Sequence, residues 1–133
     1  MKSVLFVCVH NSGRSQMAEA FLTHLSGGLI TATSAGTVPG DRVNPVVIQA
    51  MNEKGLDMSE NQPKLITQHM VDNAESVITM GCSIDETCPA LFMPSEDWGL
   101  DDPQGKPLEA VREIRDQIEN RILSLLSSQE WAI

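Results

Sequence analysis

The stretch VLFVCVHNSGRSQMAEAFL, residues 4–22, decides the fold of this chain. Its apolar start predicts a buried strand over residues 3–7, which stops at Cys8. After the polar turn HNSG, apolar residues return with the spacing of one helix face, at Ala18, Phe21, Leu22 and Leu25. The stretch therefore predicts a strand, a tight loop and a helix, with a thiol at the end of the strand and Arg14 at the start of the helix.

The rest of the chain continues this alternation of strands and helices. Further strands are predicted at residues 30–35, 76–80 and 98–100, and further helices after the Asn44-Pro45 cap, at residues 68–73 and at residues 108–126. This order predicts an α/β fold, with one domain over residues 1–133, a central four-stranded parallel sheet and helices on both faces. Ligands of such sheets bind at the carboxyl ends of the strands, where Cys8 and Cys82 both lie. On the last helix, Arg115 and Glu119 are interpreted as a solvent-exposed pair.

The composition excludes several classes of protein. The chain has 133 residues, of which 41% are apolar and 20% charged, and this suits one domain with its own core. The formal net charge of −9 argues against binding to nucleic acids or to anionic membranes. No apolar run approaches the roughly 18 residues of a membrane span, and the N-terminus lacks the features of a secretory signal. We expect a cytoplasmic protein that acts as a monomer.

The chain has three cysteines, Cys8, Cys82 and Cys88, and this odd number does not suggest a structural disulfide framework. Each of them, taken alone, is compatible with a small buried apolar residue. A zinc site needs about four ligands, and the three histidines are not spaced as ligands around these cysteines. We therefore predict no metal site, and the surroundings of each cysteine decide its role.

Residues 8–15 have the pattern C-x5-R-S at a strand-to-helix turn. The backbone N–H groups of such a loop converge with the N-terminus of the helix and bind an anion. The predicted oxyanion-binding residues are Val9, His10, Asn11, Ser12, Gly13, Arg14 and Ser15. Arg14 adds a planar guanidinium that holds two oxygens of a tetrahedral oxyanion, and the same positive field favours the thiolate of Cys8 beneath it. Ser15 is expected to donate to that sulfur, Asn11 to brace the loop, and Gly13 to allow a close approach.

CVHNSGRS, followed by QMAEAFL, resembles the phosphate-binding loop and first helix of the low-molecular-weight protein tyrosine phosphatases. The resemblance continues through SAGT at residues 34–37 and WGLDDPQGKP at residues 98–107, and it covers nearly the whole chain. The branch that the chain most resembles is the thioredoxin-coupled arsenate reductases. This resemblance implies arsenate as the substrate, with phosphate or sulfate as competing oxyanions. It also implies no bound cofactor, thioredoxin as the external reductant, and catalysis by Cys8, Cys82, Cys88, Arg14 and Asp102.

In the mechanism that the resemblance implies, Cys8 attacks the oxyanion, and Asp102 of an Asp-Pro pair protonates the leaving oxygen. Asp101 is the less suited neighbour. Cys82 then attacks Cys8 and releases the reduced product, and Cys88 attacks Cys82 and carries the disulfide outward. The family pattern usually leaves one more residue between the outer two cysteines than the segment SIDET leaves here.

Two other functions stay open at the level of the sequence. A phosphatase needs only Cys8, Arg14 and Asp102, and a non-enzymatic redox or anion sensor needs no turnover at all. Gln104 stands where the phosphatases of this family usually have a tyrosine, and the chain contains no tyrosine. Trp98 is the one nearby aromatic residue, and it is equally compatible with a place in the core. These features favour a small inorganic oxyanion over an aromatic phosphate ester.

Some members of the family that the chain resembles also bind a monovalent cation behind the loop. Glu19, Asn11 and Ser34 match part of that site. Leu65 stands where an acidic ligand is expected, so we assign no cation.

Overall fold

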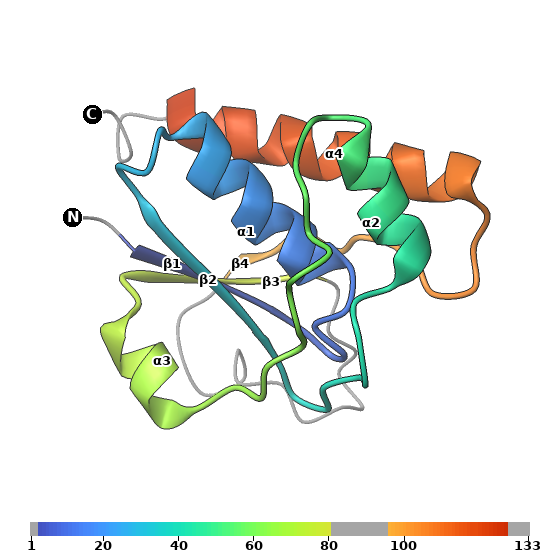
Figure 1. The fold of residues 1–133 in the computed structure, drawn as a ribbon. Coiled ribbons are helices and arrows are strands. Elements are labelled where there is room, and N and C mark those ends of the chain that lie inside the picture. Colours follow the sequence, from blue (N-terminus) through green and yellow to red (C-terminus); the bar gives the residue numbers. More distant parts are fainter. Residues whose placement is uncertain (1–2, 81–95, 128–133) are drawn as a thin grey trace.

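The computed structural model describes residues 3–80 and 96–127, in which strands and helices alternate (Figure 1). The strands are β1 (Ser3–Cys8), β2 (Thr31–Gly36), β3 (Ser76–Thr79) and β4 (Glu96–Asp97). The helices are α1 (Arg14–Leu25), α2 (Pro45–Asn52), α3 (Gln68–Asn73) and α4 (Leu108–Ser127). The strands pair in parallel in the order β2-β1-β3-β4, which confirms the predicted parallel α/β arrangement. The ends of the first three strands differ by one residue from the prediction.

The last strand lies earlier in the chain than predicted. β4 pairs with the last two residues of β3, whereas the sequence predicted a strand at residues 98–100. One further backbone hydrogen bond follows, from the Trp98 N–H to the Thr79 carbonyl at 2.9 Å. Gly99 then takes a left-handed conformation, with a φ of 60°, and this ends the extended chain. The prediction for residues 98–100 was therefore wrong, because a glycine interrupts the extended backbone within them.

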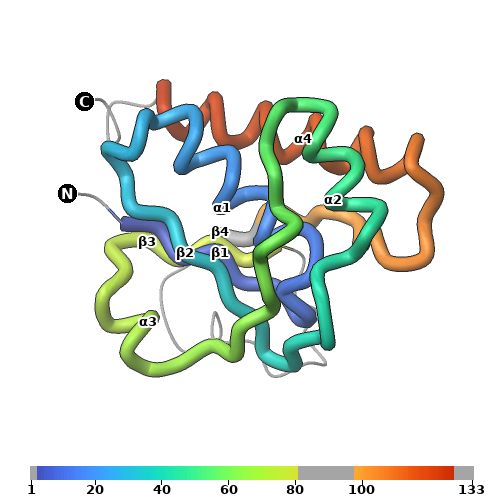
Figure 2. The backbone as a smooth tube through the Cα atoms, in the orientation of Figure 1, coloured from blue at the N-terminus to red at the C-terminus, as the bar shows by residue number. Residues whose placement is uncertain are grey.

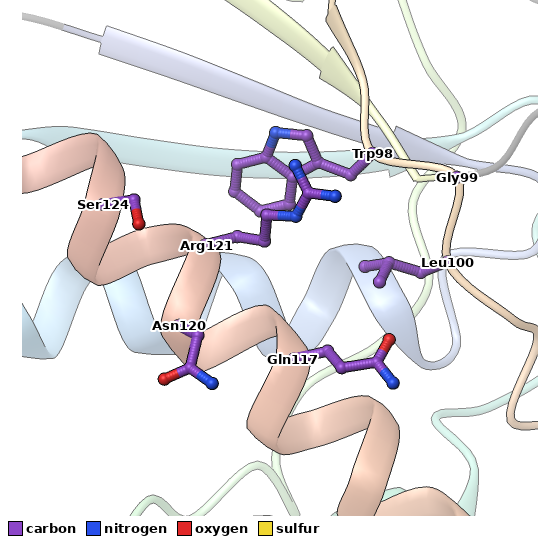
Figure 3. A pocket seen from close by; sticks show the side chains of 7 residues that line it. All are labelled: Trp98, Gly99, Leu100, Gln117, Asn120, Arg121 and Ser124. Atoms are coloured by element: carbon purple, nitrogen blue, oxygen red, sulfur yellow. The ribbon is translucent and has the colours of Figure 1, made fainter.

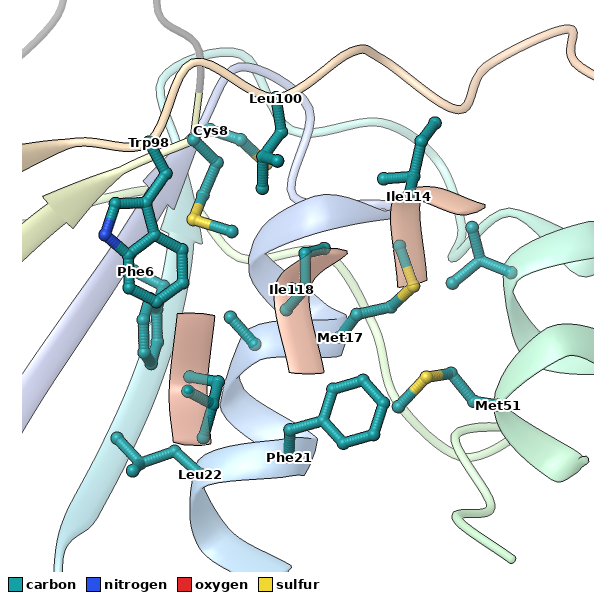
Figure 4. Packing of buried hydrophobic residues seen from close by; sticks show 14 of the residues in the cluster. Phe6, Cys8, Met17, Phe21, Leu22, Met51, Trp98, Leu100, Ile114 and Ile118 are labelled. Carbon is teal, nitrogen blue, oxygen red and sulfur yellow. The ribbon is translucent and has the colours of Figure 1, made fainter. Parts of the chain in front are cut away.

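Side chains along β1 alternate between two apolar clusters, because successive strand residues point to opposite faces of the sheet. Val4, Phe6 and Cys8 belong to the larger cluster, which α1, α2 and α4 cover (Figure 1). Leu5 and Val7 belong to the smaller cluster on the other face, where α3 packs. This alternation places the Cys8 side chain on the face of the sheet that α1 covers (Figure 4).

Trp98 belongs to the larger cluster. It is only 5% exposed, and the centroid of its ring lies 5.8 Å from that of Phe6, with the two rings tilted by 56° (Figure 4). Tilted aromatic pairs at this distance stabilise a core beyond the burial of their area. The sequence left open whether Trp98 lies in the core or offers a surface to a substrate ring, and the structure places it in the core.

Two predicted helix starts are confirmed by their caps. The side chain of Asn44 accepts from the Val46 N–H at 2.9 Å, and proline is the first residue of α2. The hydroxyl of Thr67 accepts from the Met70 N–H at 3.2 Å at the start of α3. The caps set the ends of the two segments that precede α2 and α3. Both segments contact residues 9–15, which are described below.

The predicted solvent-exposed pair of Arg115 and Glu119 was wrong. The Arg115 side chain is only 8% exposed, and it donates to the Ala50 carbonyl at 2.9 Å and to Glu53 Oε1 at 2.7 Å. Glu119 pairs instead with Lys54, at 3.1 Å between Oε1 and Nζ. The cause is tertiary packing, because α2 lies beside α4 and its carboxyl end supplies the acid nearest to Arg115 (Figure 2).

The ion pairs of Glu53 predict a stability that depends on acid. Hydrogen bonds from Arg112 and then from Arg115 lower the pKa of Glu53 from 4.5 to about 2. The folded state therefore favours the carboxylate, and this contribution is fully present above pH 4.5 and is lost as the pH falls towards 2. Thermal unfolding of Glu53→Gln should show a lower melting temperature than wild type at pH 7, and the difference should shrink between pH 4.5 and pH 2.

The control for this prediction is Glu60→Gln, since Glu60 is an exposed acid outside this network. Its melting temperature should follow that of wild type over the whole range of pH. A Glu53→Gln difference that stays constant from pH 7 to pH 2 would contradict the prediction.

Candidate active site

The anion loop, residues 9–15, leads from β1 into α1 and is held from outside by residues 37–44. The carbonyls of Cys8, Val9, His10 and Ser12 accept hydrogen bonds over 2.8–3.3 Å from the backbone N–H groups of Thr37, Val38, Gly40 and Asn44, respectively. In a trans peptide the N–H points away from the C=O of the same unit. The N–H groups of these peptides therefore face the opposite side, towards the interior of the loop. This is the arrangement that an anion-binding loop requires.

The sulfur of Cys8 lies among hydrogen-bond donors of the anion loop. The Asn11 N–H donates to Sγ at 3.2 Å, and the Ser15 Oγ lies 2.8 Å from the same sulfur. Asn11 Nδ2 donates to Ser15 Oγ at 2.7 Å, so Ser15 does not donate to Asn11, and a thiolate at Cys8 would accept its single hydroxyl proton. Two donors to the sulfur favour the thiolate, which is the nucleophilic form of cysteine.

Two residues shape the backbone of the anion loop. Asn11 has a φ of 51°, in the left-handed region that asparagine adopts more readily than most side chains. Gly36, at the end of β2, lies against the loop, and a Cβ there would stand 2.5 Å from the Val9 carbonyl oxygen and 3.0 Å from the Asn11 nitrogen. The role of Gly36 does not follow from the sequence, although a glycine at the end of a buried strand is the signal for such a close approach.

Arg14 connects the anion loop to the segment that carries Asp102. Its Nη1 donates to the Leu100 carbonyl at 2.9 Å, and its Nη2 lies 4.0 Å from Asp102 Oδ2. The Arg14 side chain is 8% exposed, whereas that of Asp102 is 48% exposed. The second carboxylate oxygen of Asp102 accepts from the Gln104 N–H at 3.0 Å, which closes a turn. The structure thus brings Asp102, rather than Asp101, to the arginine, and leaves its carboxyl open to solvent.

Gly13 allows the close approach that the sequence suggested, and this leads to a prediction. A Cβ on Gly13 would stand 2.7 Å from Cγ of Pro103, the residue after Asp102. Gly13→Ala therefore has to displace either the anion loop or the Asp102 turn, at a cost of about 1–3 kcal/mol. We expect a lower melting temperature and a kcat/KM reduced about tenfold, since misplacement of catalytic groups slows catalysis.

Gly40→Ala is the matched control, because a Cβ at Gly40 would meet its nearest atoms at 3.9 Å, an ordinary contact. It keeps the backbone N–H that holds the His10 carbonyl. If Gly13→Ala behaved like this control in unfolding and in turnover, the contact with Pro103 would have no functional weight.

The residues that resemble part of a cation site lie behind the anion loop. Glu19 Oε1 accepts from Ser34 Oγ at 2.8 Å and lies 3.5 Å from the Lys64 ammonium. The ammonium of Lys64 therefore pairs with Glu19. Leu65, the next residue, is 58% exposed. Within residues 3–80 and 96–127, no group of three or more His, Cys, Asp or Glu side chains is placed to hold a metal ion.

Two cavities lie near the segments described above. One, of about 490 Å³, opens beside the anion loop and is lined by His10, Ser12, Gly40, Asp41, Arg42, Asn44, Pro45, Gln104 and Gly105. This lining combines polar side chains with two glycines and a proline, and it includes no phenylalanine, tyrosine or tryptophan. The other, of about 590 Å³, lies between α4 and residues 98–100, and Arg121 reaches over it beside Trp98 (Figure 3).

Cys82 and Cys88 lie outside the described residues. β3, which precedes them, is the direct neighbour of β1, and the Met80 N–H donates to the Val7 carbonyl at 2.8 Å. The chain therefore leaves β3 at the carboxyl end of the sheet, where β1 also ends in Cys8.

None of the helices in the described part of the chain is long and apolar enough to span a membrane.

Comparison with known proteins agrees with this geometry. Residues 3–131 match the family described as low molecular weight phosphotyrosine protein phosphatase. A putative arsenate reductase of Halobacterium salinarum is 41% identical over 125 residues, which cover 90% of this chain and 87% of that protein. A glutaredoxin arsenate reductase of Synechocystis sp. is 39% identical over 131 residues, covering 96% and 98% of the two chains. A solved structure described as an arsenate reductase in the phosphate binding state has a TM-score of 0.84 at 39% identity, and the match covers 96% of this chain and 98% of that one. This chain belongs to the low molecular weight phosphotyrosine protein phosphatase family.

Proposed function

We propose that this protein is an arsenate reductase, which converts arsenate to arsenite by nucleophilic attack of Cys8. The observation that carries the proposal is the placement of the Cys8 sulfur, with donors from Asn11 and Ser15, at the base of a loop whose N–H groups face inward. The similar proteins named arsenate reductases, at 39–41% identity over at least 90% of this chain, support the same substrate.

The proposed first step is attack on arsenic by the thiolate of Cys8. A sulfur–arsenic bond forms, and one oxygen leaves as water after taking protons, one of them from Asp102. The guanidinium of Arg14 and the N–H groups of residues 9–15 hold the remaining oxygens as negative charge shifts between them. Asp102 suits this role because its carboxyl is half exposed and reaches the arginine that would bind the substrate.

The proposed reduction is a relay of disulfides. Cys82 attacks the sulfur of Cys8, the electron pair of the sulfur–arsenic bond stays on arsenic, and arsenite leaves with arsenic reduced by two electrons. Cys88 then attacks Cys82, which frees Cys8 and leaves a Cys82–Cys88 disulfide. An external dithiol reduces that disulfide, so that two thiols are oxidised for each arsenate reduced. The adjacency of β1 and β3 supports the first transfer, since these parallel neighbours both end at the carboxyl end of the sheet.

Arsenate suits the site better than an aromatic phosphate ester does. Trp98 is buried in the core, and no phenylalanine, tyrosine or tryptophan lines the cavity beside the anion loop, so a large aromatic surface for stacking is lacking there. Phosphate and sulfate have the same tetrahedral shape and are expected to compete. A phosphatase acting through Cys8, Arg14 and Asp102 is the second candidate, which the family of this chain supports.

We propose thioredoxin as the reductant, in a protein whose residues 1–133 act as one cytoplasmic domain. A relay that ends in a disulfide needs a reducing compartment, which supports this placement. Glutaredoxin is the alternative, since the relative from Synechocystis sp. carries that name.

The test is turnover with arsenate, NADPH and either thioredoxin with its reductase or glutaredoxin with glutathione, followed by loss of NADPH. Wild type should turn over with thioredoxin, and Cys82→Ser should release no arsenite. Cys88→Ser should release about one arsenite per enzyme and then stop, because its disulfide stays on Cys8 and Cys82. Rapid hydrolysis of para-nitrophenyl phosphate with arsenate inert would establish the phosphatase instead, and full turnover of Cys88→Ser would refute the relay.

A further inference from the structure

We propose that Gln16 is a positioning residue for Cys8: with the backbone N–H of Lys64, it fixes the direction of the Asn11 amide and thereby makes Ser15 donate to the sulfur. The inference rests on the proposed function only in taking Cys8 as the nucleophile. It assigns a role to the Gln16 side chain, on α1, and to residues 61–64, which precede α3. Both lie outside the anion loop.

Gln16 is fully buried, and both ends of its amide are hydrogen-bonded. Its Nε2 donates to Asn11 Oδ1 and to the Gln62 carbonyl, each at 3.0 Å. Its Oε1 accepts from Asn61 Nδ2 at 3.2 Å. The Lys64 N–H donates to the same Asn11 oxygen at 2.8 Å. Gln16 thus ties the anion loop to a connection that lies about 50 residues further along the chain.

Two backbone groups fix the direction of this network. A backbone N–H only donates and a carbonyl only accepts, so the contact with Lys64 must be the oxygen of Asn11, and the contact with Gln62 must be the nitrogen of Gln16. The Asn11 nitrogen is then left to face Ser15, at 2.7 Å from its Oγ. Turning either amide over breaks its backbone contact, so both contacts favour the observed orientation.

This direction decides which form of Cys8 is favoured. With the Asn11 nitrogen facing Ser15, the hydroxyl oxygen accepts from it, and the hydroxyl proton is free to point to the sulfur at 2.8 Å. If the Asn11 amide were turned over, its oxygen would take the Ser15 proton instead. The Ser15 oxygen would then accept from the Cys8 S–H, which favours the neutral thiol. The donors on Asn11 Oδ1 therefore select the reactive thiolate.

Gln16 supplies one of the two donors that hold this orientation, and it is the one that a side-chain substitution removes. A methionine has a similar length and no N–H, so Gln16→Met leaves only the Lys64 N–H to hold the Asn11 oxygen. The Asn11 amide then turns over part of the time, and the thiolate loses its hydroxyl donor for that part.

The test is the rate of Cys8 alkylation by iodoacetamide between pH 4 and pH 9, measured by mass spectrometry. A Cys82→Ser, Cys88→Ser background leaves Cys8 as the only cysteine of the chain. In Gln16→Met, the profile should shift so that Cys8 reacts about tenfold more slowly at low pH, because less of it is thiolate. The plateau at high pH should not change, because the thiolate itself is intact. Gln49→Met, an exposed position on α2, is the matched control and should keep the original profile.

A second measurement separates positioning from general damage. In a Ser15→Ala background, Gln16→Met should cause no further shift, because the hydroxyl through which it acts is gone. If Gln16→Met does not fold, Gln16→Leu removes the same donor with another apolar side chain and should give the same shift. The proposal is overturned if the folded variant keeps the original profile, or if its shift persists without Ser15. Alkylation needs no arsenate, so a failure of arsenate turnover with the shift intact would count against the proposed function alone.

Discussion

Cys8→Ser is expected to abolish arsenate reduction and any hydrolysis of phosphate esters, a loss of at least about 10³-fold in kcat. A serine hydroxyl is held in the same place, but it is far less ionised than a thiol in the same surroundings and a much weaker nucleophile. The measurement is NADPH consumption with arsenate and thioredoxin, together with the release of para-nitrophenol from its phosphate ester. Both activities are expected to disappear because both begin with the same attack.

The control for Cys8→Ser is binding of the oxyanion, which does not need the sulfur. The inward N–H groups of the anion loop and the Arg14 guanidinium remain, so phosphate should raise the melting temperatures of the variant and of wild type alike. Arsenate turnover by Cys8→Ser at more than a trace would show that another thiol makes the first attack. Loss of the phosphate effect would instead show that the loop itself had changed.

Arg14→Lys is expected to lower kcat/KM for arsenate about 100-fold, which is the usual cost of one lost donor to a developing charge. Lysine keeps the positive charge but has no planar fork to hold two oxygens. It also loses the geometry that lets one side chain donate to the Leu100 carbonyl at 2.9 Å and reach towards Asp102. We therefore expect a lower kcat as well as weaker binding, measured by steady-state kinetics over a range of arsenate concentrations.

Arg121→Lys is the matched control for this substitution, since Arg121 is an exposed arginine on α4. Its kinetics should equal those of wild type. If Arg14→Lys raised KM alone and left kcat unchanged, Arg14 would bind arsenate and its transition state equally, and its proposed role in catalysis would be refuted.

Much of the fold and of the anion loop follows from local sequence patterns. The apolar run before Cys8 and the helical spacing after Arg14 place a thiol and an arginine at the two ends of one turn, because strand and helix geometry are set within a few residues. The caps at Asn44 and Thr67 were predictable for the same reason. These features depend on neighbours in sequence, and such neighbours are visible in the chain.

The features that the sequence did not predict depend on residues far apart along the chain. Arg115 pairs with Glu53 because two helices pack together, and an i,i+4 pattern cannot show that. Gln16 reaches a connection about 50 residues away, and a buried glutamine in the first turn of a helix carries no signal of its partner. The end of pairing at Gly99 likewise depends on a backbone angle rather than on the apolar pattern.

Residues 37–44 hold the anion loop by hydrogen bonds from their backbone N–H groups, and this has a consequence for how the site can change. Backbone N–H groups survive almost any substitution except proline, so the shape of the loop is insulated from changes in the side chains that surround it. Asp41 and Arg42 of the same segment line the adjoining cavity. Substitution of Asp41 or Arg42 would alter the side chains beside the oxyanion site and leave the position of the Cys8 sulfur unchanged. Residues 37–44 thus combine a backbone that fixes the loop with side chains that can be substituted without moving it.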